Sequence, residues 1–380
     1  TNTPESTAEC TDDLLACAKD SSIADLVPDE ATEATGEPIE LGMVNQENTA
    51  AGSYPELSSA VEAGIEFVNT ELGGVNGRPI SVEVCNTEFS TEGSTSCGQQ
   101  FVESGAPAVL GGIDVFGNGI EVLDDNGVPF IGGIPVSEAS GVSSNSFQWS
   151  GGSWGSIVGF ADFATTELDV KKVSIVFGEF GSITEAAEMG QQVLEARGVE
   201  VQMIPYPVVA TDISAPLNAA GTFDPDAIFL LAADSGCKAG FDGIDSLGID
   251  AHKFFSGACA SPAILEEAGP GKTEGTYFNV ESPVDQDNPE TDAALYQSIV
   301  DTYGNGFDAV GAGTVTFKAF MNLYRVLVEL DGDSTPEAIM SSLKAKVDAP
   351  GYWGHTYTCD GEQFDGLPAL CSPEQIIVQQ

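Results

Sequence analysis

The stretch LGMVNQENTAAGSYPELSSAVEAGIEFVNTELGGVNGRPISVEVC, residues 41–85, carries the pattern that decides the fold. An apolar strand, residues 38–44, leads through a polar loop into residues 56–72, where apolar side chains recur at helical spacing before a Gly-Gly pair. Residues 79–85 then alternate apolar and polar side chains, as a strand does. This order predicts two parallel strands joined by a crossover helix.

The same alternation of strands and helices continues along the chain. It predicts two α/β units, each a doubly wound parallel sheet, with the glycine-rich residues 150–155 between them. In the first unit the pattern continues with a helix over 95–104, a strand over 107–113, a helix over 119–127 and a strand over 129–134. In the second unit we expect strands over 171–178, 199–206, 226–232 and 253–258 and helices over 183–198 and 240–248. Three helices, over 291–304, 311–330 and 335–347, and two strand-like pieces, over 355–364 and 375–380, complete the chain.

Length, composition and charge limit the classes of function. A chain of 380 residues with 42% apolar residues is expected to form two folded domains. No apolar run approaches the roughly 20 residues of a membrane-spanning helix, and the sequence does not open with a signal peptide. The formal net charge of −47 repels phosphate backbones, so we expect no binding to nucleic acid. We interpret this charge as a solvating acidic surface, because no segment has the spacing of a calcium-binding loop.

The eight cysteines indicate an exported protein. They fall into four couples that are close in sequence, which favours disulfides without proving the pairing. A metal site is the alternative, but the sequence has no C-x-x-C motif, and its two histidines lie far from most of the cysteines. The couples are Cys10 with Cys17, Cys85 with Cys97, Cys237 with Cys259, and Cys359 with Cys371.

Residues 1–36 differ in composition from the rest of the chain. They are acidic, rich in Thr, Ala and Glu, and poor in aromatic side chains. The pattern predicts a short helix followed by a linker, so we expect an acidic N-terminal tail outside the main fold.

Residues 41–85 resemble the opening of the leucine/isoleucine/valine-binding proteins. These are type I periplasmic binding proteins, which deliver solutes to ABC importers. The shared features are the strand, the polar loop and an amphipathic helix followed by GG-x-x-G-R/K-P. Residues 108–133 resemble the second strand–loop–helix–strand unit of that family, and residues 171–201 resemble the start of its second lobe. The resemblance runs in order over residues 38–380.

The resemblance implies two doubly wound α/β lobes joined by three crossings of the chain, near residues 149–153, 279–283 and 350–355. Lobe one then comprises residues 37–150 plus 284–350, and lobe two comprises residues 151–283 plus 351–380. A ligand is expected where the carboxyl ends of the strands face the cleft between the lobes.

The family also implies a function. The expected protein is a monomeric, extracytoplasmic substrate-binding protein that hands a small organic solute to the permease subunits of an ABC importer. It requires no cofactor and is not an enzyme. Its location is periplasmic or at the cell surface, with a lipid anchor on a removed N-terminal segment as one way to hold it there. A ligand-sensing ectodomain of the same fold is the alternative.

The family's ligand positions lie in the loops after the strands. The corresponding candidates in lobe one are Gln46, Asn48, Tyr54, Ile113, Asp114, Val115, Phe116, Pro135, Val136 and Ser137. Those in lobe two are Phe180, Ser182, Asp234 and Ala258, to which we add Trp154 because of its place at the first crossing, as an aromatic wall. The alternative for the loop aspartates is that they are solvated turn residues. The alternative for Phe116 and Phe180 is that they belong to the cores of the lobes.

Three of these positions depart from the family. Val115 stands where the family offers a serine hydroxyl to the carboxylate of the ligand, and Ser182 stands where a tyrosine packs on the ligand. Ala258 replaces the glutamate that accepts the ammonium group in the branched-chain amino-acid binders. A buried ammonium without an anion costs several kcal/mol, so an amino acid would need Asp114 or Asp234 instead. The apolar lining favours a small amino-acid-like solute, carboxylate or amide with an apolar portion.

The motif GGSWG, residues 151–155, raises the remote alternative of a serine hydrolase. It fits G-x-S-x-G, which would make Ser153 a nucleophile and His355 its base. The preceding residues are polar and aromatic rather than a buried strand, no HGG segment supplies an oxyanion donor, and no acid adjoins His355. We therefore interpret the glycines as a hinge.

Overall fold

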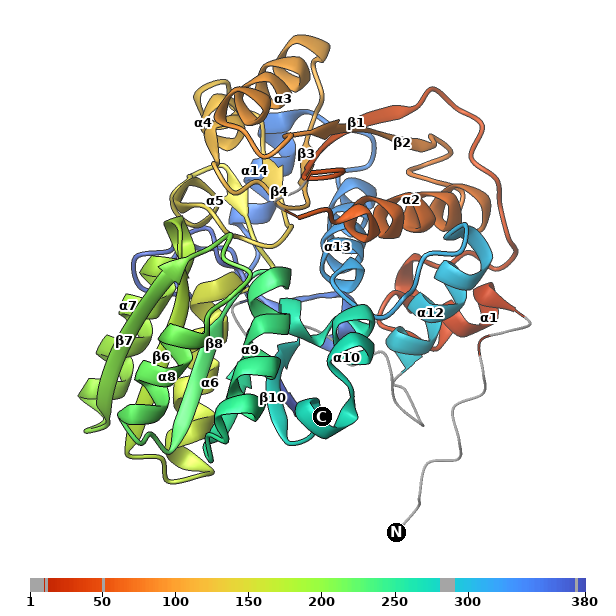
Figure 1. The fold of residues 1–380 in the computed structure, drawn as a ribbon. Helices are drawn as coiled ribbons and strands as arrows, with labels where there is room; N and C mark the ends of the chain where they lie inside the picture. The colour runs from red at the N-terminus through yellow and green to blue at the C-terminus, as the bar shows by residue number, and fades with distance from the viewer. Residues whose placement is uncertain (1–9, 11–12, 50–51, 281–290, 373–374) are drawn as a thin grey trace. The chain divides into compact units, whose positions relative to one another are not determined.

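The computed structural model describes residues 10, 13–49, 52–280, 291–372 and 375–380, apart from the side chain of Asp234. The chain divides into two compact units (Figure 1). Unit 1 is Thr1–Ser150 with Ser282–Pro373, and unit 2 is Gly151–Glu281 with Glu374–Gln380. Among the described residues no helix is long and apolar enough to cross a membrane.

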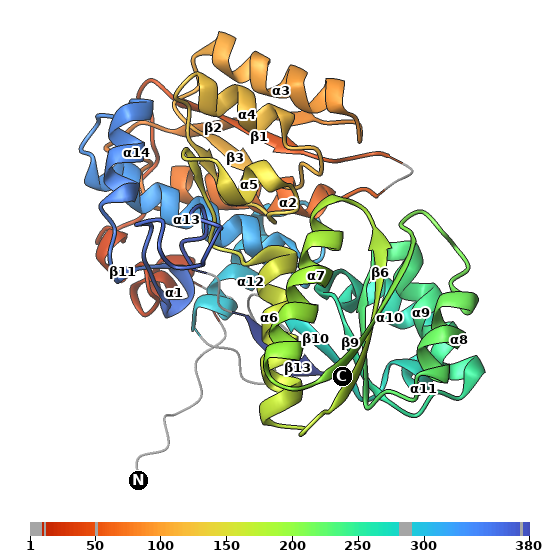
Figure 2. The same ribbon diagram turned by 90° about the vertical axis from the view of Figure 1, so that its left-hand side faces the viewer.

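Unit 1 is built on a parallel five-stranded sheet in the order β2-β1-β3-β4-β5. Helices α2 and α13 cover one face of the sheet, and α3 and α4 cover the other (Figures 1 and 2). The strands are β1 (Ile39–Asn45), β2 (Ile80–Asn86), β3 (Val109–Gly111), β4 (Phe130–Ile131) and β5 (Ser146–Phe147). The helices are α2 (Pro55–Thr70), α3 (Thr91–Ser104), α4 (Asn118–Asp125), α5 (Glu138–Val142), α12 (Thr291–Tyr303), α13 (Gly313–Glu329) and α14 (Pro336–Lys344).

Helix α2 shows how the sequence produces this packing. Pro55 starts the helix at a position that needs no hydrogen-bond donor, and Leu57, Val61 and Val68 are fully buried. At Gly64 the helix approaches α13 so closely that an added Cβ would lie 2.9 Å from the Phe320 ring. The helical periodicity therefore defines the buried face, and the glycine allows the close approach.

Unit 2 is a six-stranded sheet in the order β13-β10-β9-β8-β6-β7, in which only β13 runs antiparallel to its neighbour. One face carries a cluster of Phe160, Phe229 and Phe254. The strands are β6 (Lys172–Glu179), β7 (Glu200–Pro207), β8 (Ala227–Leu231), β9 (His252–Phe255), β10 (Thr276–Val280) and β13 (Ile376–Gln379). The helices are α6 (Gly152–Thr166), α7 (Gly181–Ala196), α8 (Ser214–Thr222), α9 (Asp234–Leu247), α10 (Pro262–Ala268) and α11 (Pro270–Thr273), with the 3₁₀ turn η2 (Gly257–Ala260).

In unit 2 helix α9 begins earlier than the sequence predicts, and helices α8, α10 and α11 were not predicted. Helix α9 begins at Asp234 rather than at 240, because Cys237, Phe241 and Ile244 share one buried face at helical spacing. Helix α8 was missed because only two of its residues, Leu217 and Ala220, are buried, which is too few to show a helical period in the sequence.

The N-terminal segment also differs from the prediction. Its described part packs into unit 1 rather than standing outside the fold: α1 (Leu14–Lys19) buries Ala18, and Ile23 is 1% exposed. The Arg325 side chain of α13 forms a paired contact with the Asp25 carboxylate, at 2.5 and 3.0 Å. These long-range contacts could not be read from the acidic composition.

The last crossing lies later in the chain than the predicted 350–355. Residues 351–372 belong to unit 1, where Tyr352, in the 3₁₀ turn η3 (Tyr352–Gly354), donates from its hydroxyl to the Asp292 carbonyl. The Gln148 N–H donates to the Ala369 carbonyl, beside β5. Of the strand-like piece predicted over 355–364, only β12 (Thr356–Tyr357) forms, as one strand of a two-stranded ribbon with β11 (Ala349–Pro350).

The four predicted disulfides are confirmed. The structure pairs Cys10 with Cys17, Cys85 with Cys97, Cys237 with Cys259, and Cys359 with Cys371. Each bond joins segments close in sequence, so each fixes a local loop or helix end rather than the division into units.

Candidate ligand-binding site

In parallel sheets ligands bind at the carboxyl ends of the strands, so the site begins with the loops there. In unit 1 the side chain of Asn45, the last residue of β1, joins two of these loops. Its amide nitrogen donates to the Tyr54 carbonyl at 2.9 Å, and its oxygen accepts from the Ile113 N–H at 3.1 Å. Sequence reasoning missed Asn45, although a buried polar residue at the end of an apolar strand is a usable signal.

The loop after β1 holds three of the predicted residues. Gln46 is 1% exposed and donates to the Gly52 carbonyl at 3.2 Å, while its Oε1 has no hydrogen-bond partner among the described residues. Asn48 adopts a positive φ of 55°, and its N–H donates to the Ser53 hydroxyl. Tyr54 is half-buried and packs against the unit 1 core. This loop therefore presents one buried acceptor atom, the Gln46 Oε1, that no other described residue pairs with.

Asp114 organises the loop after β3. It is 4% exposed and accepts hydrogen bonds from the Ser94 hydroxyl at 2.7 Å and from the N–H groups of Phe116 and Gly117 at 3.3 and 3.1 Å. Burial raises the pKa of the Asp114 carboxyl, against the lowering effect of these hydrogen bonds. The carboxylate is therefore buried rather than part of a solvated turn, and its contact with a ligand stays a prediction.

Other predicted residues of the unit 1 loops are apolar and wholly or partly buried. Ile113 and Pro135 are buried, and Val115 and Val136 are half-buried against the core. Phe116 is half-buried, and its ring lies 5.4 Å from that of Phe89.

Ser137 brings the loops after β3 and β4 together. It is 4% exposed, and an added Cβ on Gly117 would lie 2.7 Å from its hydroxyl oxygen. Its N–H donates to the Ser140 hydroxyl at the start of α5. The predicted residues of the β3 and β4 loops therefore lie at one edge of the sheet.

In unit 2 the predicted residues lie on separate elements. Phe180 is half-buried in front of α7, and Ser182 is 2% exposed in its first turn. Asp234 is the first residue of α9, and Ala258 is exposed in η2. Trp154, in α6, is 2% exposed, and its role as an aromatic wall stays a prediction.

The loops after β8 and β9 are cross-linked. The Ser256 hydroxyl donates to the Ala232 carbonyl at 3.0 Å, and the Cys237–Cys259 disulfide joins the first turn of α9 to η2. The Gly257 N–H donates to the Asn279 side chain at 2.8 Å. Two hydrogen bonds and one disulfide therefore fix the loop that carries Ala258.

The hydrolase motif has a different setting from the one that its chemistry needs. Ser153 is half-buried inside the first turn of α6, and residues 148–151 separate that helix from β5. The strand-to-helix elbow that exposes a nucleophilic serine is therefore not formed. Ser153 belongs to unit 2, whereas His355 is an exposed residue of unit 1.

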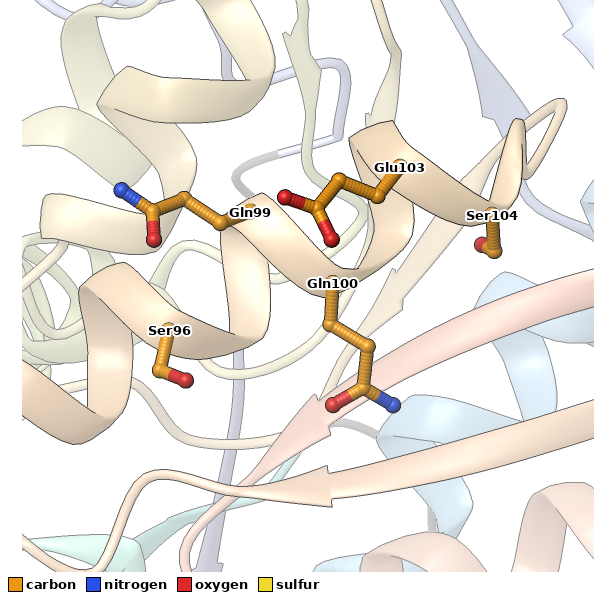
Figure 3. Close-up of a pocket in the computed structure, with 5 residues that line it drawn as sticks. All are labelled: Ser96, Gln99, Gln100, Glu103 and Ser104. Carbon is orange, nitrogen blue, oxygen red and sulfur yellow. The ribbon is translucent and has the colours of Figure 1, made fainter.

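Two surface hollows of unit 1 lie away from the carboxyl edge. One, of about 430 Å³, is lined only by polar side chains of α3, Ser96, Gln99, Gln100, Glu103 and Ser104 (Figure 3). The other, of about 460 Å³, lies at the amino ends of β1 and β2, where Arg78 donates to the carbonyls of Glu37 and Pro38. In the described part of the chain no three His, Cys, Asp or Glu side chains group as metal ligands.

Known structures share this fold. A possible leucine/isoleucine/valine-binding protein from Rhodopirellula baltica matches with a TM-score of 0.77 and 11% identity over 92% of this chain and 95% of its own. The substrate-binding protein LivJ from Streptococcus pneumoniae, solved with isoleucine, matches at 0.73 and 15%, over 90% of this chain and 96% of its own. A solute-binding protein from R. palustris, solved with 4-hydroxybenzoate, matches at 0.73 and 15%, over 90% and 93%. The comparison with curated protein sequences gave no match.

The sequence itself carries the family signature. The model of the family described as periplasmic binding protein matches residues 38–365, most of the chain. The resemblance in residues 41–85 and the two α/β units are confirmed by this match and by the shared fold. The chain therefore belongs to the periplasmic binding protein family.

Proposed function

We propose that this protein is an extracytoplasmic substrate-binding protein that captures a small organic solute and delivers it to the permease subunits of an ABC importer. The match to the periplasmic binding protein family over residues 38–365 carries the proposal, because members of this family bind solutes outside the cytoplasm. In this proposal the protein acts as a monomer, either in the periplasm or at the cell surface.

The carboxyl edge of unit 1 supports a binding role. An unpaired polar atom in a protein interior costs about 1 to 3 kcal/mol, so such atoms are normally paired with protein, water or ligand. Within the described part of the chain the Gln46 Oε1 is such an atom, in the loop that also contains Tyr54. A donor group on the ligand, or a water that the ligand displaces, satisfies it.

The residues also narrow the class of solute. Phe116 and Phe89 offer an aromatic surface, and Ile113, Val115 and Pro135 are apolar. Solved relatives hold isoleucine and 4-hydroxybenzoate, so the fold accepts both an amino acid and an aromatic acid.

Ala258 offers no carboxylate to an ammonium group, and the Asp114 carboxylate already accepts hydrogen bonds from Ser94 of α3 and from Gly117 of its own loop. We therefore infer that the solute is a small carboxylate or amide with an apolar portion, and that it does not need a buried ammonium partner.

A thermal-shift screen tests the proposal. The panel contains isoleucine, leucine, 4-hydroxybenzoate, 4-hydroxybenzamide and the short-chain carboxylates, each at millimolar concentration. A ligand present at 100 times its Kd stabilises the folded protein by about 2.7 kcal/mol, which raises Tm by several degrees. We expect the aromatic acid or amide to shift Tm more than the amino acids do. A panel without any shift, together with ester turnover that disappears in Ser153→Ala, would overturn the binding function.

A further inference from the structure

Tyr206, near the end of β7, carries a buried hydroxyl that no described residue pairs with. The residue is 2% exposed, and its Oη has no hydrogen-bond partner among the described residues. Burying a hydroxyl without a partner is costly, and a phenylalanine would fill the same space without that cost. The hydroxyl is therefore a feature that packing alone does not explain.

The hydroxyl lies over the first turn of α9. An added Cβ on Gly236, the third residue of that helix, would lie 2.4 Å from the Tyr206 Oη and 2.9 Å from the Cβ of Ala232. On the neighbouring strand β6 the residue paired with Tyr206 is Gly178, which has no side chain. The small residues Gly178, Ala232 and Gly236 thus leave room for the Tyr206 ring between β7 and α9.

This turn of α9 offers further donors. Ala233 precedes the helix and provides no side-chain cap, and the first N–H to donate within the helix is that of Cys237, to the Ala233 carbonyl at 3.0 Å. The N–H groups before it therefore lack a helical acceptor, and the helix dipole favours an electron-rich group in front of them. The Cys237–Cys259 disulfide and the bonds of Ser256 hold the turn in place.

We propose that the Tyr206 hydroxyl and the first-turn N–H groups of α9 form a subsite that binds an acceptor oxygen of the solute, from a carboxylate or an amide carbonyl. The subsite deepens the function proposed above and rests on it. All its groups are donors: burial raises the pKa of the Tyr206 phenol, so it stays protonated at neutral pH. Asp234 opens the same helix, so a neutral carbonyl is as suitable an acceptor as a carboxylate.

The substitution Tyr206→Phe tests the subsite, with 4-hydroxybenzoate and 4-hydroxybenzamide as probes and p-cresol as an analogue without the acceptor group. We expect Kd for the acid and the amide to rise about tenfold or more, because one hydrogen bond to the ligand is lost. The Kd for p-cresol stays the same. The Tm of the ligand-free protein stays the same or rises, because no hydrogen bond within the described protein is removed.

Tyr357→Phe is the matched control. Tyr357 is also a buried tyrosine whose hydroxyl lacks a partner among the described residues, but it belongs to unit 1. This variant should leave every Kd unchanged. If a probe binds the wild type and Tyr206→Phe does not weaken that binding, the subsite is overturned but the proposed function stands. The same holds if both variants weaken the binding equally. If neither probe nor any other compound of the panel binds the wild type, the proposed function fails and the subsite with it.

Discussion

Removing the Asp25 carboxylate should destabilise unit 1 and release the N-terminal segment. The Arg325 side chain is 5% exposed, and two of its nitrogens contact Asp25, while a third contact reaches the Ser22 carbonyl at 2.9 Å. In Asp25→Ala the carbonyl of Ser22 is the one hydrogen-bond partner that this buried guanidinium keeps among the described residues. The variant therefore leaves the desolvated charge of Arg325 without its compensating carboxylate, which lowers the free energy of unfolding.

The exposure of Arg325 and Asp25 determines how much the substitution lowers the free energy of unfolding. Breaking a fully buried ion pair costs about 3 to 5 kcal/mol, whereas an exposed pair contributes about 0.2 to 1 kcal/mol. Asp25 is 63% exposed, which screens the interaction, so we expect Asp25→Ala to lower the free energy of unfolding by about 1 to 3 kcal/mol. For a unit of this size that corresponds to a fall in Tm of roughly 3 to 10 °C.

Calorimetry and limited proteolysis measure the two effects. The unit 1 transition should move to lower temperature, and cleavage within residues 13–36 should become faster. Arg325→Met is the companion variant, because it fills the buried space without a charge; combined with Asp25→Ala, it should recover most of the lost stability. An unchanged Tm and an unchanged cleavage pattern in Asp25→Ala would refute the reasoning, because the segment would then be the loose tail that its composition suggests.

Two further predictions concern the loops at the carboxyl edges. The raised pKa of Asp114 means that the folded state holds this proton more tightly than the unfolded state, so its contribution to stability falls as pH rises from its unfolded pKa through its folded pKa. Asp114→Asn should abolish that slope in urea unfolding measured from pH 3 to pH 7; an unchanged slope contradicts the assignment. Replacing Cys237 and Cys259 by Ala opens a loop of 22 residues and should destabilise unit 2 by about 3 kcal/mol in calorimetry, and an unchanged unit 2 transition would contradict this.

Local sequence was sufficient for most of the fold. The helical spacing in residues 56–72 and the alternation in residues 79–85 correspond to α2 and β2, because burial on one face imposes a period on the sequence. Adjacent cysteines predicted all four disulfides, since each bond closes a short loop. The resemblance that starts at residue 41 led to the family.

The site was less accessible to sequence reasoning. A loop position predicts that a residue lies near the carboxyl edge, and Gln46 and Ser137 do lie there, but it does not predict where the side chain points. Asp114 turns inward to Ser94, a residue of another helix, and Trp154 is buried. The orientation of each side chain depends on neighbours that the loop sequence does not contain.

The sequence by itself determined the alternating strands and helices, the two α/β units, the disulfides and the acidic surface, because these follow from short-range periodicity and composition. Only the tertiary structure decided that Asp25 pairs with Arg325, that residues 351–372 stay with unit 1, and that Tyr206 reaches the first turn of α9. The physical reason is the same in each case. These contacts join residues whose local sequence carries no periodic signal of the partner, so their energy appears only when the sheet and its helices bring distant segments together.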